Sequence, residues 1–158
     1  MATTLIDLSP GDMAHRLGDA LAVYVDAMRY PRGTEDQRAS MWLEHTRRQG
    51  WKAVAAVENG AQKIGAPDDA ALTAAPMLGV AYGYSGAPDQ WWQQQVVSGL
   101  RRSGADQAHI SDLMNNYFEL TELHIHPRAQ GRGLGEALIR RLLGGRGEQH
   151  VLLSTPEI

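Results

Sequence analysis

The stretch HPRAQGRGLGEALIRRLL, residues 126–143, has three glycines in strict alternation, Gly131, Gly133 and Gly135, directly before an apolar helical stripe. The preceding segment, YFELTELHIHP (117–127), is typical of a strand. Because glycine costs backbone entropy on folding, so many glycines at the start of a helix predict a function that offsets this cost. Unobstructed backbone N–H groups at the positive end of a helix dipole favour phosphate. The alternative is a tight turn that binds nothing, although such a turn needs only one glycine.

Two common phosphate-binding motifs do not fit this turn. A Walker A loop requires G-x-x-x-x-G-K-[ST], and the chain has no such string. A dinucleotide-binding fingerprint requires G-x-G-x-x-G, followed by further βα units and an acidic residue about 20 positions later. Here the spacing is G-x-G-x-G, and too few residues follow Gly135 to build those units.

The composition excludes several classes of protein. With 158 residues, 43% hydrophobic and 21% charged, the chain is long enough for one folded domain and too apolar for a disordered protein. Its formal net charge of -3 argues against a general nucleic-acid binder. It has no cysteine, which excludes disulfides, thiolate nucleophiles and cysteine-based zinc sites. The chain shows no signal-peptide pattern and no apolar run of bilayer length, so we expect a cytoplasmic protein without a membrane partner.

The pattern along the chain predicts a single domain, residues 1–158, of strands and helices. Ser9 and Pro10 suit an N-cap and a first helical position, and Thr34 with Gln37 resembles a capping box. The apolar runs at 51–58 and 77–86 are expected to pair as a hairpin. The predicted strands cover 3–9, 51–58, 77–86, 117–127 and 150–156; the predicted helices cover 10–28, 34–49 and a segment ending at about 143; a helical insert covers about 88–116.

Residues Gln130 to Gly135, QGRGLG, resemble the [QR]-x-x-G-x-[GA] signature of the GCN5-related N-acetyltransferases (GNAT). The position of this signature, after a strand and before an amphipathic helix, and the order of the predicted elements are also similar to that family. The resemblance implies an α/β fold of the mixed α+β kind, with a central, mostly antiparallel sheet flanked by helices. It implies transfer of an acetyl group from acetyl-CoA, the co-substrate, to a primary amine of a small molecule or peptide. The alternative is a CoA-binding module of the same fold with little or no catalysis.

The resemblance also implies where CoA binds. The amides from Gly131 to Glu136 would hold the pyrophosphate, and the backbone of residues 123–125 would pair with the pantetheine arm as if it were an extra strand. Arg128 and Arg132 are placed to meet CoA phosphates, or are ordinary solvated arginines. The cofactor-binding residues implied in this way are Leu123, His124, Ile125, Gln130, Gly131, Arg132, Gly133, Leu134, Gly135 and Glu136.

Two glutamates are candidates for the catalytic base. Acetyl transfer requires removal of a proton from the amine, and the resemblance places an acidic residue for this step near the start of the 117–127 strand. Glu119 and Glu122 both fit; strict alternation along a strand places them on opposite faces, and Glu119 ranks slightly first. Glu122, His124 and His126 have a spacing that is compatible with a metal ion, but the resemblance implies no metal.

Trp91 and Trp92 form an aromatic pair in the helical insert. One interpretation is that they line an acceptor pocket or a partner surface. The other is that they pack in the core of an extra helix.

The C-terminus departs from the pattern that the resemblance implies. Members of the family usually continue with a helix, which carries a tyrosine as general acid, and two further strands, whereas this sequence stops at LLSTPEI. An uncovered strand edge favours pairing with another chain. We therefore expect weak catalysis by this form alone, or a homodimer through the edge of the last predicted strand.

Overall fold

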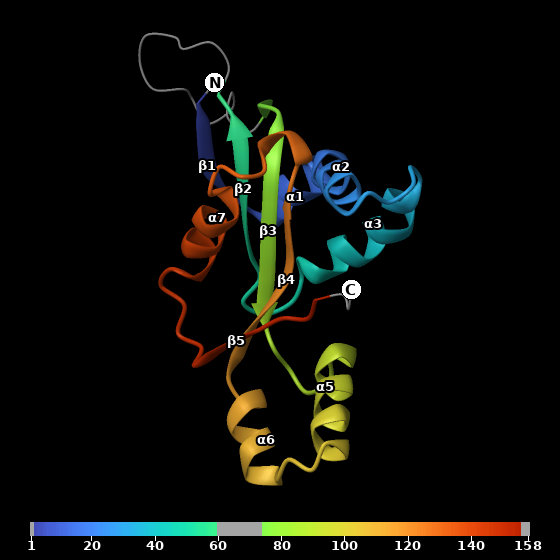
Figure 1. The fold of residues 1–158 in the computed structure, drawn as a ribbon, viewed down its shortest axis with the longest axis vertical. Helices are drawn as coiled ribbons and strands as arrows, with labels where there is room; N and C mark the ends of the chain where they lie inside the picture. The colour runs from blue at the N-terminus through green and yellow to red at the C-terminus, as the bar shows by residue number, and fades with distance from the viewer. Residues whose placement is uncertain (1, 60–73, 156–158) are drawn as a thin grey trace.

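The computed structural model describes residues 2–59 and 74–155. Its centre is a five-stranded sheet in the order β1-β2-β3-β4-β5, in which the first four strands are antiparallel to their neighbours and β4 is parallel to β5 (Figure 1). The strands are β1 (Thr3–Leu8), β2 (Lys52–Glu58), β3 (Met77–Ser85), β4 (Tyr117–Ile125) and β5 (His150–Leu152). The predicted mixed α/β fold and the β2–β3 hairpin are confirmed.

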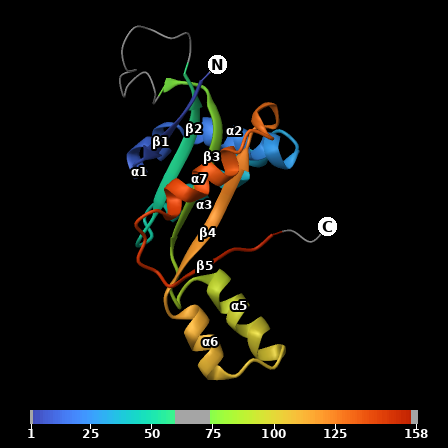
Figure 2. The same cartoon turned by 60° about the vertical axis from the view of Figure 1, so that its left-hand side comes forward.

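Helices cover both faces of the sheet (Figure 2). On one face lie α1 (Pro10–His15), α2 (Leu17–Met28) and α3 (Thr34–His45); on the other lies α7 (Leu134–Leu143). The core has accordingly two main parts. Tyr24, Trp42 and Tyr82 belong to the part under α1 to α3, and Phe118 and Leu138 belong to the part under α7.

The predicted helix starts are correct in one case and wrong in another. Ser9 caps α1 as expected, because its hydroxyl accepts from the Asp12 amide and the Asp12 carboxylate accepts from the Ser9 amide. The expected helix over 10–28 is interrupted at Arg16, whose buried guanidinium donates to the carbonyl of Ala75. Thr34 does not form a capping box: the N-cap of α3 is Gly33, with φ of 101°, and the Thr34 hydroxyl donates to Pro31.

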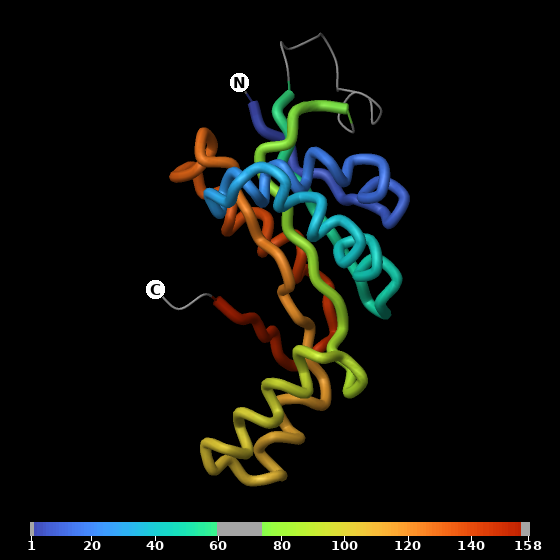
Figure 3. The backbone as a smooth tube through the Cα atoms, turned by 90° about the vertical axis from the view of Figure 1, so that its right-hand side faces the viewer, coloured from blue at the N-terminus to red at the C-terminus, as the bar shows by residue number. Residues whose placement is uncertain are grey.

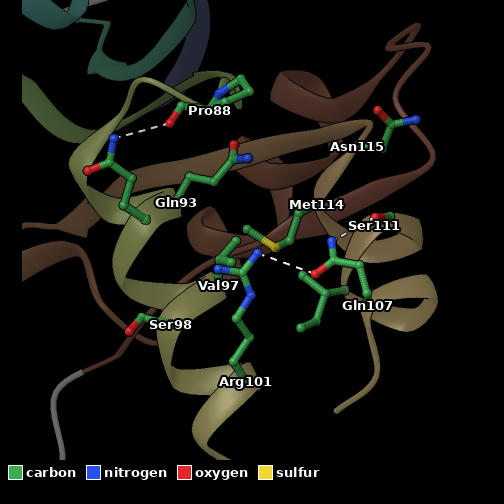
Figure 4. A pocket seen from close by; sticks show the side chains of 11 residues that line it. Pro88, Gln93, Val97, Ser98, Arg101, Gln107, Ser111, Met114 and Asn115 are labelled. Atoms are coloured by element: carbon green, nitrogen blue, oxygen red, sulfur yellow. Dashed lines mark hydrogen bonds between the residues drawn. The ribbon is translucent and has the colours of Figure 1, made fainter.

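The insert between β3 and β4 is a helical hairpin of α5 (Trp91–Arg102) and α6 (Gln107–Met114), which extends beyond the end of the sheet (Figure 1). The hydroxyl of Tyr117, the first residue of β4, donates to Gln93 Oε1 at 3.0 Å and ties the hairpin to the sheet. A pocket of about 410 Å³ lies between the two helices, where Arg101 donates to Gln107 at 3.3 Å (Figure 4).

A β-bulge in β4 corrects the predicted faces of the two glutamates. Tyr82 lies opposite Glu122, but Gly83 lies opposite Leu120, so Thr121 is an extra residue in β4. Glu119 lies opposite Tyr84, and Tyr82 and Tyr84 both belong to the core under α1 to α3. The prediction of opposite faces was therefore wrong: the extra residue brings both carboxylates to the same face. 

No helix within residues 2–59 and 74–155 has the length and apolar character needed to cross a membrane.

Candidate active site

The candidate site begins where β4 and β5 separate. β5 pairs with β4 only along Tyr117–Glu119. The chain after β5 turns away from β4 (Figure 3), and the edge of β4 that faces away from β3 has no strand partner from Leu120 to Ile125 in the part of the chain that the structure describes. The side chains of Leu123 and Ile125 pack in the core under α7. An extended ligand can therefore pair with the backbone of this edge without disturbing the core.

The glycine turn lies at the end of this edge. A short 3-10 helix (Pro127–Ala129) follows β4; Gly131 and Gly133 then adopt left-handed φ angles of 79° and 76°, and Gly133 is the N-cap of α7. The left-handed backbone favours glycine at these two positions. Gly135 is different: it lies in the first turn of α7, and a Cβ there would meet no protein atom within 4 Å. Glycine within a helix costs about 1 kcal/mol relative to alanine, and no contact within the described chain accounts for it here. The absence of a side chain leaves room for a group close to the backbone of this turn.

Most of the side chains around the turn already have partners. Gln130 Nε2 donates to the carbonyl of Ile125 at 3.0 Å and closes the turn back onto β4. Arg128 pairs with Glu58 at 3.3 Å, and Arg132 donates to the carbonyl of Arg128 at 3.1 Å. Leu134 packs against the core, and the exposed Glu136 pairs with Arg140. Residues 131–133 are exposed at the N-terminus of α7, and two arginines lie beside them; backbone amides at a helix N-terminus with nearby positive charge are the chemistry of an anion site.

Glu119 is a buried acid with one oxygen that has no partner within the described ranges. Its carboxylate is buried, with 6% of the residue exposed. Oε2 accepts from the Thr121 hydroxyl at 3.2 Å and from the Tyr84 hydroxyl at 3.4 Å, and Tyr84 in turn accepts from Arg48 at 2.7 Å. Oε1 is buried and has no partner among the described residues. Burial raises the pKa of Glu119, and the hydrogen bond from Thr121 and the charge of Arg48 oppose the rise.

Glu122 is bound to a neighbour on the same face. Its Oε1 lies 2.6 Å from Nε2 of His124, whose ring packs against those of Tyr24 and Trp42. His126 turns away and pairs with Asp26 on α2 at 3.2 Å. Glu122, His124 and His126 therefore do not converge on one point, and among residues 2–59 and 74–155 no group of three or more metal-ligating side chains is suited to a metal.

Several residues of this site were not found from the sequence. Tyr84, Arg48 and Thr121 surround Glu119, and Tyr82 bonds His45 at 2.8 Å beside them. Burial lowers the pKa of His45 to about 4, so it is neutral near neutral pH. Tyr82 and Tyr84 alternate within the predicted strand at 77–86, which indicates that they share a face. No sequence pattern connects them with their partners, which lie 35 to 37 positions away in the chain.

The contact of Arg48 with Tyr84 leads to a test by pH. The positive charge of Arg48 favours the ionised form of Glu119, so Arg48→Gln raises the pKa of Glu119 further. If Glu119 must be ionised to act, the acidic limb of the kcat/KM profile for acetyl transfer moves to higher pH in this variant. The exposed Arg102 on α5 provides a control, because Arg102→Gln makes the same charge change far from β4. Equal shifts in both variants, or none in Arg48→Gln, would contradict the role assigned to Glu119.

Comparison with known proteins identifies the family. The chain is 69% identical over 164 residues, which is 99% of this chain and 80% of the other, to the GCN5-like protein acetyltransferase Rv2170 of Mycobacterium tuberculosis. No family profile matches the chain. The chain belongs to the GCN5-related N-acetyltransferases, and it is an acetyltransferase of the GNAT type.

Solved structures agree on the fold. An aminoglycoside acetyltransferase from an uncultured soil metagenomic sample superposes with a TM-score of 0.58 at 16% identity, over 100% of this chain and 82% of that one. Aminoglycoside N-acetyltransferase AAC(6')-Iy, solved in complex with CoA, superposes with a TM-score of 0.56 at 12% identity, over 98% of this chain and 78% of that one. Because the sequence identity is so low, these structures support the fold of the chain and nothing beyond it.

Proposed function

We propose that this protein transfers the acetyl group of acetyl-CoA to a primary amine of a protein or peptide. Family membership and the CoA complex of a structural neighbour support acetyl-CoA as the donor. The name of the 69% identical relative, a protein acetyltransferase, supports a protein or peptide as the acceptor.

The observation that carries the proposal is the arrangement of two features along β4. The glycine turn presents backbone amides at the N-terminus of α7, and Glu119 lies at the other end of the open edge, where β5 leaves β4. Between them, the edge of β4 that faces away from β3 is unpaired over about six residues, from Leu120 to Ile125. At about 3.3 Å per residue, this edge has the reach to carry an extended arm from the phosphates to the base.

Each part of the site then has a chemical task. The amides of residues 131–136 bind the pyrophosphate, with Arg128 and Arg132 nearby, and the edge of β4 orients the pantetheine arm. Acetyl-CoA supplies a thioester carbonyl that an amine attacks. Glu119 accepts a proton from the amine on its partnerless Oε1, which frees the nitrogen lone pair. The nitrogen attacks the carbonyl and forms a bond to the acetyl carbon. The carbon–sulfur bond then breaks, and the proton that the acylated nitrogen loses goes to the sulfur, so CoA leaves as the thiol.

Glu119 suits this task better than Glu122. Glu119 Oε1 has no hydrogen-bond partner among the described residues, whereas Glu122 Oε1 is held by His124. The raised pKa of Glu119 also makes it a stronger base than an ordinary glutamate once it is ionised. We assign Glu122 the role of holding the ring of His124 in place against Tyr24 and Trp42.

The experiment that tests the proposal measures thiol release from acetyl-CoA with and without an acceptor. Lysine-containing peptides and a small primary amine serve as acceptors, and mass spectrometry locates the acetyl group on the product. We expect release that depends on the acceptor, with acetylation of peptide amines. Binding of CoA without any release that depends on an acceptor would favour the alternative, a CoA-binding module of this fold.

A further inference from the structure

A second cavity lies on the side of Glu119 away from the glycine turn. It is a cleft of about 730 Å³ between the C-terminal end of α3 and the start of α5, which lies below α3 in Figures 1 and 3. Its lining includes Glu44, Arg47, Arg48, Asp89, Gln90 and Trp91. Arg48 connects the cleft to the base, because it donates to Tyr84, which donates to Glu119.

Gln90 in the lining has an unused hydrogen-bond acceptor. Only 8% of this residue is exposed; its Nε2 donates to the carbonyl of Ser85 at 3.1 Å, while its Oε1 has no partner in the described part of the chain. A buried acceptor without a donor destabilises the protein. A main-chain N–H of a bound polypeptide is a donor of the kind that this oxygen lacks.

Trp91 gives the same cleft an exposed aromatic surface. It is 70% exposed, the most exposed of the large hydrophobic residues in the described ranges. Its neighbour Trp92 instead packs against the hairpin core and Tyr117. An exposed tryptophan beside a cleft is costly in water and is typical of the few residues that dominate a protein interface.

The charges of the cleft distinguish between possible ligands. Glu44, Arg47 and Asp89 form no ion pair within residues 2–59 and 74–155, and they contribute both signs of charge. A site for a polycation such as an aminoglycoside gains from carboxylates alone, because nearby arginines repel it. A polypeptide carries side chains of either charge, which match a lining that holds both carboxylates and arginines. Its main-chain N–H groups are donors for the unused amide oxygen of Gln90.

We infer that this cleft binds the stretch of acceptor polypeptide next to the amine that is acetylated. Gln90 Oε1 accepts a main-chain N–H of the acceptor, and the indole of Trp91 packs on one of its side chains. This inference rests on the proposed function and adds the surface that recognises the acceptor. It gives the α5–α6 hairpin a task, since the bond from Tyr117 to Gln93 fixes the start of α5 relative to β4.

The test compares Trp91→Ala with the wild type, using short synthetic peptides with one central lysine and a small primary amine as acceptors. We expect KM for the peptides to rise about tenfold, the loss typical of an interface tryptophan. KM for acetyl-CoA and kcat/KM for the small amine stay unchanged, because the small amine does not reach the cleft. Gln95→Ala, an exposed position one turn further along α5 and outside the cleft lining, is the matched control.

Peptide binding measured without turnover separates this inference from the proposed function. Fluorescence anisotropy of a labelled peptide in the presence of CoA should show about tenfold weaker binding to Trp91→Ala than to the Gln95→Ala control. Peptide that binds through Trp91 without acceptor-dependent thiol release would refute the proposed function and leave the binding surface standing. Peptide acetylation or binding that is unaffected by Trp91→Ala, equal losses for the peptide and the small amine, or no peptide binding to the wild type would overturn the inference.

Discussion

Glu119→Gln is expected to lower kcat for acetyl transfer by about 100- to 10,000-fold, the usual contribution of a general base. The amide keeps the size of the side chain and can still accept from Tyr84 or Thr121, but it cannot take a proton from the amine. Affinity for CoA stays the same, since the glycine turn and the β4 edge are untouched. Steady-state kinetics together with calorimetric titration of CoA measure both quantities.

Glu122→Gln provides the comparison, because it changes the same chemical group three residues along on the same face. Its effect on kcat should be much smaller, since the Glu122 carboxylate is engaged by His124. The reverse order of the two effects would move the catalytic role to Glu122. A double Gln variant as active as the wild type at neutral pH would exclude both residues.

Glu119→Gln is also expected to change the thermal stability of the protein in a pH-dependent way. The pKa of Glu119 is higher in the folded chain than in the unfolded chain, so its contribution to stability is present at acid pH and is lost as pH rises through the folded pKa. Above the folded pKa the wild type carries a buried charge that Glu119→Gln lacks. The Tm of the variant relative to the wild type should therefore rise with pH, and this gain should disappear below the ordinary pKa of glutamate, about 4.3. A relative Tm that falls as pH rises would show that this carboxylate is stabilising as an ion.

Gly133→Asp is expected to abolish CoA binding. Gly133 is the N-cap of α7, and its backbone lies in the left-handed region. A side chain at this position points into open space, where we place a phosphate of CoA. Two unit charges about 4 Å apart repel by about 4 kcal/mol at an effective dielectric constant near 20. We therefore expect the affinity for CoA to fall at least 100-fold. A 100-fold loss corresponds to about 2.7 kcal/mol of binding free energy, which is less than this repulsion. Calorimetric titration of CoA measures the affinity.

Gly133→Asn is the matched control for this prediction. Asparagine and aspartate have the same size, both tolerate left-handed backbone and both cap helices, so the two variants differ in charge alone. Asparagine should weaken binding much less than aspartate. Equal losses in the two variants would assign the effect to bulk or backbone, and unchanged binding in folded Gly133→Asp would place the phosphates elsewhere.

The strands and helices near the glycine turn were predictable because their signals are local. A helix that begins at glycines, a Ser-Pro cap and apolar runs of strand length each depend on a few adjacent residues, and the α1 cap, the β2–β3 hairpin and α7 are found where expected. The end of β5 was overestimated: the structure gives His150–Leu152, and the predicted strand extended to residue 156, beyond the described residues. The homodimer through this strand stays a prediction.

The orientation of the catalytic face was not predictable in the same way. Alternation gives the face of a side chain only while the strand is regular, and the bulge at Thr121 leaves no mark in the sequence. The contacts that set the properties of Glu119 also come from other elements: Tyr84 lies on β3, and Arg48 follows α3. Such long-range contacts depend on the packing of the whole sheet, so a single sequence does not reveal them.

The most direct measurement is a crystal structure of the protein with CoA bound. We expect the pyrophosphate within hydrogen-bonding distance of the amides of residues 131–136, the pantetheine arm paired with the edge of β4 along Leu120 to Ile125, and the sulfur near Glu119. CoA bound at another surface, or bound with its phosphates at the glycine turn and its sulfur directed away from Glu119, would refute the proposed site.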